Sequence, residues 1–213
     1  MRAVQQGAGR CMRNKSVCGR AIAVPADVAD PEQTEEIVES ALDQFGRVDI
    51  LVNNAGVTHP AQSILDLDLD LLDRVFAVDF KGVYLCSRAG GRAMLAKGGV
   101  ILNISSIAGL TPLPLPVYGP MKSAVNMLTR ILAREWAACG IRVNAIAPGY
   151  FKTEMTRALY EDEKFDAWLC SRVPANRWGD PAELVGAAVF LAARASDYVN
   201  GHLIYVDGGL TLR

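Results

Sequence analysis

The chain has 213 residues, a length that favours one domain over two. Apolar residues make up 51% of the chain and charged residues 21%, which is typical of a globular protein that buries a core. The formal net charge of −1 argues against nucleic-acid binding, and every apolar run is shorter than the roughly 18 residues of a membrane span, so neither nucleic acid nor a membrane is a predicted partner.

Apolar runs alternate with helix-like segments, which predicts an α/β protein with a parallel sheet flanked by helices. In chain order we expect strand 21–28, helix 31–45, strand 48–53, a mostly helical stretch at about 67–96, strand 99–105, helix 117–138, strand 141–147, helices 153–172 and 181–195, and strand 203–206. Asp30 and Asp180 are predicted N-caps, each followed by a proline, and Gly46 and Gly140 are predicted to end helices. Functional loops of such a sheet lie at the carboxyl ends of the strands.

Cysteine and histidine usage predicts neither a disulfide framework nor a metal site. The five cysteines form no C-x-x-C pair, and their number is odd. They are Cys11, Cys18, Cys86, Cys139 and Cys170. This usage fits a reducing, cytoplasmic compartment. His59 and His202 stand alone in the sequence, so we expect loop or surface histidines there.

The strongest single signal is Tyr118, followed four residues later by Lys122 in a predicted helix. Residues i and i+4 share a helix face, so the phenol and the ammonium project in the same direction. Lowering a tyrosine pKa from about 10 to about 7 takes about 4 kcal/mol, which a unit charge about 4 Å away supplies at an effective dielectric constant of about 20. Pro120 requires the helix to begin near Tyr118, where the macrodipole also favours phenolate. Taken alone, the pattern also fits a surface pair on an amphipathic helix.

Three further motifs lie where strands are predicted to end. Residues 53–56 (NNAG) let a flat ligand approach the backbone, and a serine within residues 105–109 (SSIAG) could hydrogen-bond a carbonyl oxygen on which charge develops. Pro148 and Gly149 close the next strand, and Thr153 follows. Taken singly, each of the three motifs also fits an ordinary turn.

Taken together and in this order, these motifs and residues 206–209 (VDGG) resemble the short-chain dehydrogenase/reductase family in its single-domain form. The resemblance runs from about residue 20 to the last residue. It implies a Rossmann-like doubly wound parallel sheet. It also implies an oxidoreductase that transfers a hydride between a nicotinamide cofactor, NAD or NADP, and the alcohol or ketone of a small-molecule substrate.

The resemblance also implies roles for individual residues. Tyr118 is the general acid/base, Lys122 lowers its pKa and holds the nicotinamide ribose, and Ser106 orients the substrate carbonyl. Asp27 and Val28 match the pair that contacts adenine. The other implied cofactor contacts are Asn54, Ala55, Gly56, Pro148, Gly149, Phe151 and Thr153.

Within the family, the chain is most similar to gluconate 5-dehydrogenases. The likeness rests on residues 147–156 (APGYFKTEMT), 167–169 (AWL), 177–181 (RWGDP) and 196–202 (SDYVNGH). It implies a sugar acid or polyol substrate, such as gluconate or 5-ketogluconate. A 3-oxoacyl carrier-protein reductase, which shares the catalytic motifs, is the alternative.

Two departures from the family pattern concern the catalytic residues. Asp79 stands where many relatives have an asparagine that holds a water; we expect Asp79 to be an altered fourth catalytic residue that holds Lys122 or a water, and a solvated or capping helix residue is the alternative. Tyr118 follows Ser106 by 12 residues, one fewer than usual for the family, across a loop stiffened by Pro112, Pro114 and Pro116.

The third departure concerns the front of the fold. No TG-x-x-x-G-x-G turn follows a strand, and Gly7-Ala8-Gly9 opens no apolar helix, so we expect the first two strands of the family fold to be missing. The predicted organisation is an unrelated or disordered segment at residues 1–20 and a truncated catalytic domain at residues 21–213. We also predict that strand 21–28 fills the apolar edge that this loss would leave on strand 48–53.

These departures leave two hypotheses open beside a working enzyme with an incompletely given sequence. The chain could be an inactive fragment, or a subunit that only assembles with intact relatives. Family members form oligomers through their long helices and last strand, so a homo-oligomer, a tetramer or a dimer, is expected.

Overall fold

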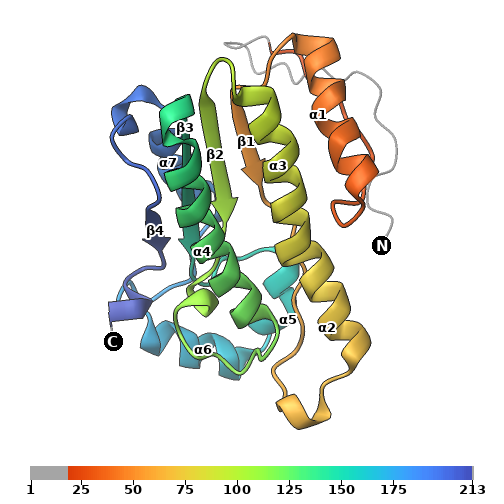
Figure 1. Ribbon diagram of the computed structural model, residues 1–213. Coiled ribbons are helices and arrows are strands. Elements are labelled where there is room, and N and C mark those ends of the chain that lie inside the picture. Colours follow the sequence, from red (N-terminus) through yellow and green to blue (C-terminus); the bar gives the residue numbers. More distant parts are fainter. Residues whose placement is uncertain (1–18, 213) are drawn as a thin grey trace.

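The computed structural model describes residues 19–212, whose framework is a four-stranded parallel sheet (Figure 1). The strands are β1 (Ile50–Asn53), β2 (Gly99–Ile104), β3 (Ile141–Pro148) and β4 (Leu203–Val206), and they lie in that order across the sheet. Each differs from its predicted counterpart by two residues or fewer at an end. The predicted parallel α/β sheet is therefore confirmed.

The helices follow the predicted segments, but two of these segments are divided, and the helix predicted at 181–195 is α-helical only over 185–192, after the 3-10 turn Pro181–Leu184. They are α1 (Pro31–Phe45), α2 (Leu69–Phe76), α3 (Val83–Met94), α4 (Tyr118–Trp136), α5 (Arg157–Tyr160), α6 (Glu163–Arg172) and α7 (Val185–Ala192). The stretch predicted at 67–96 is divided by a π-helical segment, η2 (Ala77–Gly82). The helix predicted at 153–172 is divided because Asp162 caps a new helix by accepting from two backbone N–H groups. None of the helices that the structure describes is both long and apolar enough to cross a membrane.

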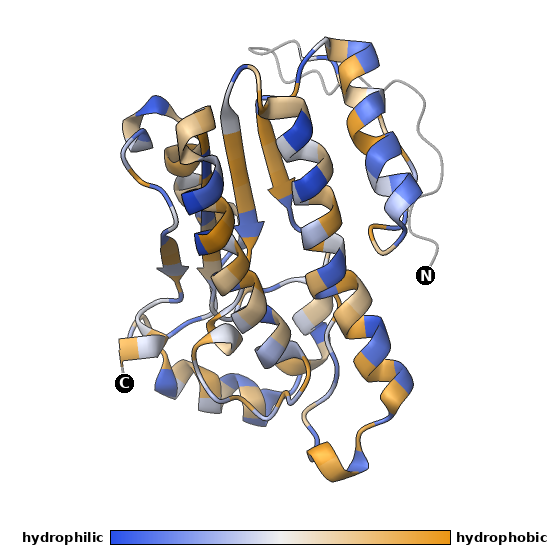
Figure 2. Ribbon diagram, viewed as in Figure 1, coloured by the Kyte–Doolittle hydropathy of each residue, from blue (hydrophilic) through white to orange (hydrophobic). Residues whose placement is uncertain are grey.

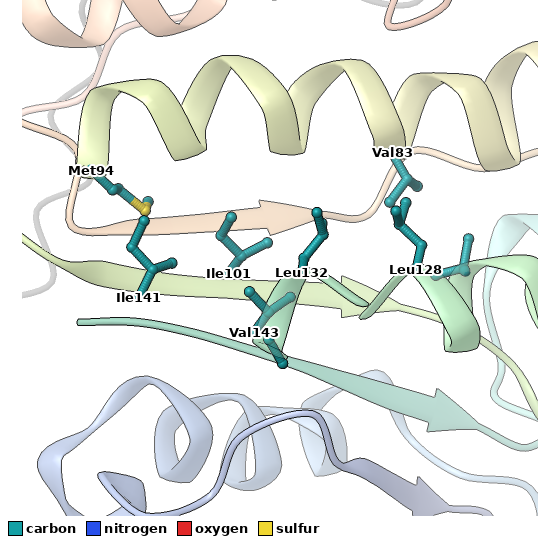
Figure 3. Packing of buried hydrophobic residues seen from close by; sticks show 9 residues of the cluster. Val83, Met94, Ile101, Leu128, Leu132, Ile141 and Val143 are labelled. Atoms are coloured by element: carbon teal, nitrogen blue, oxygen red, sulfur yellow. The ribbon is translucent and has the colours of Figure 1, made fainter. Parts of the chain in front are cut away.

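Two apolar clusters sandwich the sheet between helices. On one face, α3 and α4 pack against β2 and β3 through residues that include Val83, Met94, Leu128 and Leu132 (Figure 3). On the other face, Leu191 of α7 packs against β2 and β3. Figure 2 shows the strands as mostly hydrophobic, as expected for a sheet covered on both faces.

The position of α7 gives the last crossover an unusual hand. The strands advance in one direction from β1 to β4, but α3 and α4 cover one face and α7 covers the other. The β3–β4 connection therefore has the hand opposite to the first two, which are right-handed like the great majority of parallel crossovers.

The strand predicted at residues 21–28 is wrong. The segment has no strand conformation, and most of its residues are exposed. α1, which follows it, packs on α3, and the Val28 side chain lies against Gly82 of η2, so the segment runs beside the helical layer and not beside β1. Pro25 also removes one of the donors that a sheet requires.

The prediction that this segment fills the edge of β1 is therefore also wrong. Within residues 19–212, β1 pairs only with β2, and its Ile50 and Val52 side chains remain about half exposed. The predicted N-terminal segment, residues 1–20, lies outside the described residues apart from its last two.

Candidate active site

The carboxyl ends of the four strands meet at one edge of the sheet, where the loops carry most of the predicted site residues (Figure 1). β1 ends at Asn53, β2 at Ile104, β3 at Pro148 and β4 at Val206. Helix α4 begins at this same edge with Tyr118. The edge therefore brings loops from distant parts of the sequence to the start of one long helix.

A buried polar network fixes α4 to this edge. The Asn53 side-chain amide donates to the Ser87 hydroxyl at 2.9 Å and to the side-chain oxygen Oδ1 of Asn103 at 2.8 Å. Asn103 in turn donates to the Thr129 hydroxyl of α4 at 2.9 Å. Nearer the site, the Ser105 hydroxyl donates to Asn126, also on α4. These hydrogen bonds fix the position of α4 relative to β1 and β2, and thus the positions of Tyr118 and Lys122.

Lys122 and Asp79 form a buried ion pair at the centre of the site. The Lys122 ammonium lies 3.1 Å from Asp79 Oδ2 and donates to the Ile104 carbonyl at 3.1 Å. Both side chains are almost entirely buried. The expectation that Asp79 holds Lys122 agrees with this geometry, whereas a solvated helix position does not.

Asp79 is held in place by the η2 turn and by the loop after β1. The Val57 backbone N–H donates to Asp79 Oδ1 at 2.8 Å. Asp79 Oδ2 pairs with the Lys122 ammonium and accepts from no other group among the residues that the structure describes. A Cβ on Gly56 would lie 3.2 Å from this oxygen and 3.6 Å from the Lys122 ammonium, so glycine at position 56 leaves room beside the pair. Burial raises the pKa of Asp79, and Lys122 opposes that rise.

Tyr118 is the first residue of α4, as Pro120 requires, and its ring lies beside the Lys122 ammonium, 5.4 Å from centroid to nitrogen. The predicted lowering of its pKa is not found. Burial and the charge of Asp79 raise the Tyr118 pKa to about 12, and the Ser106 hydroxyl opposes this rise. The main reason is that burial disfavours the phenolate, and the negative charge of Asp79 adds to this effect.

Ser106 follows β2 and caps the short 3-10 turn Ile107–Gly109 by accepting from the Ala108 N–H at 3.1 Å. The capping role and the contact with Tyr118 therefore coexist in one residue. Despite the short, proline-rich loop, the hydroxyl stays close enough to influence the phenol.

The predicted cofactor residues lie in three groups. Asn54 and Ala55 are exposed and lead directly to Gly56 beside the ion pair. The β3 group packs against β4 and residue 179: the Gly149 N–H donates to the Val206 carbonyl, Phe151 forms a bridge with Gly179, and Thr153 caps the turn Glu154–Thr156. Val28 reaches the end of η2, three residues after Asp79, whereas the Asp27 side chain turns back to accept from the Ala29 N–H.

Sequence reasoning missed one buried residue that reaches Tyr118. His59 was expected to be a loop or surface histidine, yet it is 5% exposed, and its Nε2 lies 3.4 Å from the Tyr118 backbone nitrogen. The two residues are 59 positions apart, so periodicity gave no signal of the contact. Asn126 and Thr129, three residues apart on one face of α4, were also missed, although polar residues on a buried helix face were a usable signal.

Comparisons with known proteins agree with the motifs. A family profile described as enoyl-(acyl carrier protein) reductase matches residues 3–211. The 5-keto-D-gluconate 5-reductase of Escherichia coli K12 is 48% identical over 200 residues, which cover 90% of this chain and 76% of the relative. The gluconate 5-dehydrogenase of Gluconobacter oxydans is 41% identical over 188 residues, covering 87% and 73%.

Solved structures give the same result for the fold. A gluconate 5-dehydrogenase from Burkholderia cenocepacia, in complex with NADP and tartrate, superposes with a TM-score of 0.84 at 42% identity. The match covers 88% of this chain and 74% of that one. Over the matched part, the two chains share the sheet and its helices.

Proposed function

This chain belongs to the short-chain dehydrogenase/reductase family, and from that premise we propose that it is an NAD(P)-dependent oxidoreductase acting on a sugar acid. The substrate class is that of 5-ketogluconate and gluconate. The observation that carries the proposal is the meeting of Tyr118 with the buried Lys122–Asp79 pair at the carboxyl edge of a sheet shared with gluconate 5-dehydrogenases.

The residues around Lys122 fit a cofactor that carries hydroxyl groups. Asp79 Oδ2 is a buried acceptor paired with the Lys122 ammonium, and that ammonium is a strong donor with three N–H groups. Glycine at position 56 leaves space at the same point. We assign Lys122 and Asp79 to the nicotinamide ribose, and the bound cofactor supplies or accepts the hydride.

The other predicted cofactor contacts are retained in this proposal. Asn54, Ala55 and Gly56 would line the cofactor after β1, and Asp27 and Val28 would contact adenine. Pro148, Gly149, Phe151 and Thr153 would line it after β3. NADP is the cofactor to test first, because the Burkholderia relative binds it.

Proton transfer is assigned to Tyr118. In the reductive direction, the phenol donates its proton to the substrate oxygen as the carbonyl becomes an alcohol, and the Ser106 hydroxyl donates a hydrogen bond to the same oxygen. With a pKa of about 12, Tyr118 is a neutral phenol at neutral pH, which is the form that this step uses. Reduction at neutral pH is therefore the direction to assay first.

The test is turnover by the purified 213-residue chain. Oxidation of NADPH or NADH is followed with 5-ketogluconate and, separately, with an acetoacetyl thioester. We expect turnover of the sugar acid, and none in Tyr118→Phe. Preference for the thioester would instead support a 3-oxoacyl carrier-protein reductase. A folded chain that binds neither cofactor would contradict the enzyme proposal and favour the assembly-only subunit.

We also propose that the chain forms a homo-oligomer. A groove of about 600 Å³ runs between α3 and α4, lined by apolar side chains that include Met127 and Ile131. Both residues are about half exposed. Arg88 and Glu135 lie in the same groove, so two copies related by a two-fold axis could match opposite charges around an apolar centre.

A cytoplasmic location remains part of the proposal. The free thiols of Cys86, Cys139 and Cys170 fit a reducing compartment.

A further inference from the structure

His59 lies in the loop that joins β1 to the 3-10 turn Ile64–Asp66, and it is buried although both of its sequence neighbours are exposed. Its imidazole is 5% exposed. A polar ring is buried at low cost only when its nitrogens have partners. The partners of this ring connect the loop to the start of α4.

The contacts of the ring determine which nitrogen carries the proton. His59 Nδ1 lies 2.8 Å from the Pro60 carbonyl oxygen, which can only accept, so Nδ1 is the protonated nitrogen. Nε2 then carries a lone pair, and it lies 3.4 Å from the backbone nitrogen of Tyr118. The Tyr118 N–H therefore donates to His59.

This contact serves the first turn of α4, where N–H groups lack helical partners. The N-cap residue Val117 provides no side-chain cap. The Gly119 N–H donates to the Leu115 carbonyl, the Met121 N–H donates to the Val117 carbonyl, and Pro120 has no N–H. The Tyr118 N–H is the donor that remains, and His59 satisfies it from another loop.

A second hydrogen bond joins the same two loops. The Gln62 N–H donates to the Pro114 carbonyl at 3.3 Å. Between residues 110 and 116, the loop that enters α4 consists of exposed and half-buried residues. The β1 loop thus holds the start of α4 at two points, one of which is the Tyr118 backbone itself.

We propose that His59 is a positioning residue that fixes the backbone of Tyr118 by capping α4 with its neutral imidazole. The inference rests on the proposed function, because it assigns Tyr118 the proton transfer. A displacement of about 1 Å at a reacting group costs up to about 100-fold in rate, so a cap on this residue bears directly on kcat.

The experiment compares three substitutions of His59. His59→Gln places an amide oxygen near the position of Nε2 and keeps the acceptor. His59→Leu fills the space without an acceptor, and His59→Asn places its oxygen near Nδ1, too short to reach Tyr118. We expect kcat to fall about tenfold or more in the Leu and Asn variants and to recover in the Gln variant, with the KM for cofactor changing less than about threefold.

A second readout does not depend on turnover. Hydrogen exchange of the Tyr118 amide should be faster in the Leu and Asn variants and close to that of the unmodified chain in the Gln variant. Thr58→Val, at the exposed neighbouring position, is the matched control and should change neither readout.

The outcomes separate the two proposals. If Leu, Asn and Gln variants lose kcat equally, or if Tyr118 exchange is unchanged in all of them, His59 only packs the loop and the inference is overturned. If the unmodified chain shows no turnover, the proposed function fails, and the exchange pattern still decides whether His59 caps α4. If the Leu variant does not fold, the Asn and Gln pair gives the same comparison.

Discussion

Asp79 puts a negative charge where the proton-transfer group has to ionise. Its carboxylate lies beside Lys122 and offsets the positive charge of the lysine. The phenolate form of Tyr118 is then disfavoured both by burial and by Asp79, which is why its pKa is raised to about 12. The acid strength of Tyr118 is thus set first by burial and then by the charge of Asp79.

Replacing Asp79 with asparagine tests whether the charge of Asp79 raises the Tyr118 pKa. Asp79→Asn keeps an acceptor for the Val57 N–H, removes the carboxylate charge and leaves Lys122 unneutralised. The pKa of Tyr118 should therefore fall. Alcohol oxidation needs the phenolate and rises as pH rises through that pKa, so the rise should move to lower pH by about one unit or more. The measurement is the pH dependence of kcat/KM for oxidation of gluconate.

Asp73→Asn, an equal change of charge at an exposed position of α2, is the control and should leave the profile in place. A profile that does not move in Asp79→Asn would mean that Asp79 is already protonated in the working enzyme, since burial raises its own pKa.

At the level of residues, the sequence predicted which side chains would meet at the site better than it predicted how their charges would shift the Tyr118 pKa. The four-residue spacing placed Tyr118 beside Lys122, and Pro120 placed the start of the helix. The predicted direction of the Tyr118 pKa shift was wrong because the shift depends first on the burial of Tyr118 and then on the charge of Asp79, and tertiary packing determines both. The His59 contact was beyond reach for the same reason.

At the level of elements, α4 depends on polar bonds that cross from the sheet. Thr129 is fully buried, accepts from Asn103 and donates to the Val125 carbonyl. Asn103 also accepts from Asn53, so a single hydroxyl completes a chain from β1 through β2 to α4. Such a series of hydrogen bonds specifies one position of α4 along the sheet, which an apolar interface alone would define less sharply.

Thr129→Val keeps the shape of the side chain and removes its hydroxyl. The Asn103 amide then loses its acceptor in a buried position, and we expect the free energy of unfolding to fall by about 1–3 kcal/mol. Urea unfolding measures this change in the free energy of unfolding. Thr58→Val, the same change at an exposed position, should stay within about 0.5 kcal/mol of the unmodified chain. Equal stability of the two variants would mean that the network does not hold α4.

Local signals explain which elements were predicted well. Helix α1 begins and ends at the predicted residues because Asp30 accepts from the Glu32 and Gln33 N–H groups and Gly46 adopts φ of 75°. Both devices act within a few residues of the helix. Residues 21–28 have the composition of a strand, but a strand also needs a neighbour, and within the described residues α1 carries this segment away from β1.

At the level of the whole molecule, the α3–α4 groove is the surface that the proposed oligomer would cover. The two helices lie side by side on the outer face of the sheet (Figure 1). Tyr84, Met127 and Ile131 expose about half of their surface there, between Arg88 and Glu135. An apolar centre with charges at its rim is the composition of a stable protein interface.

Ile131→Glu should dissociate an oligomer built on this groove. The new carboxylate would be buried without a partner in the interface, one helical turn from Glu135, so desolvation and like-charge repulsion both oppose association. We expect a lower molar mass by light scattering after gel filtration. Leu65→Glu, at the 91% exposed residue of the loop after β1, should leave the mass unchanged. If Ile131→Glu keeps the mass of the unmodified chain and Leu65→Glu lowers it, the copies associate through the β1 loop and not through α3 and α4.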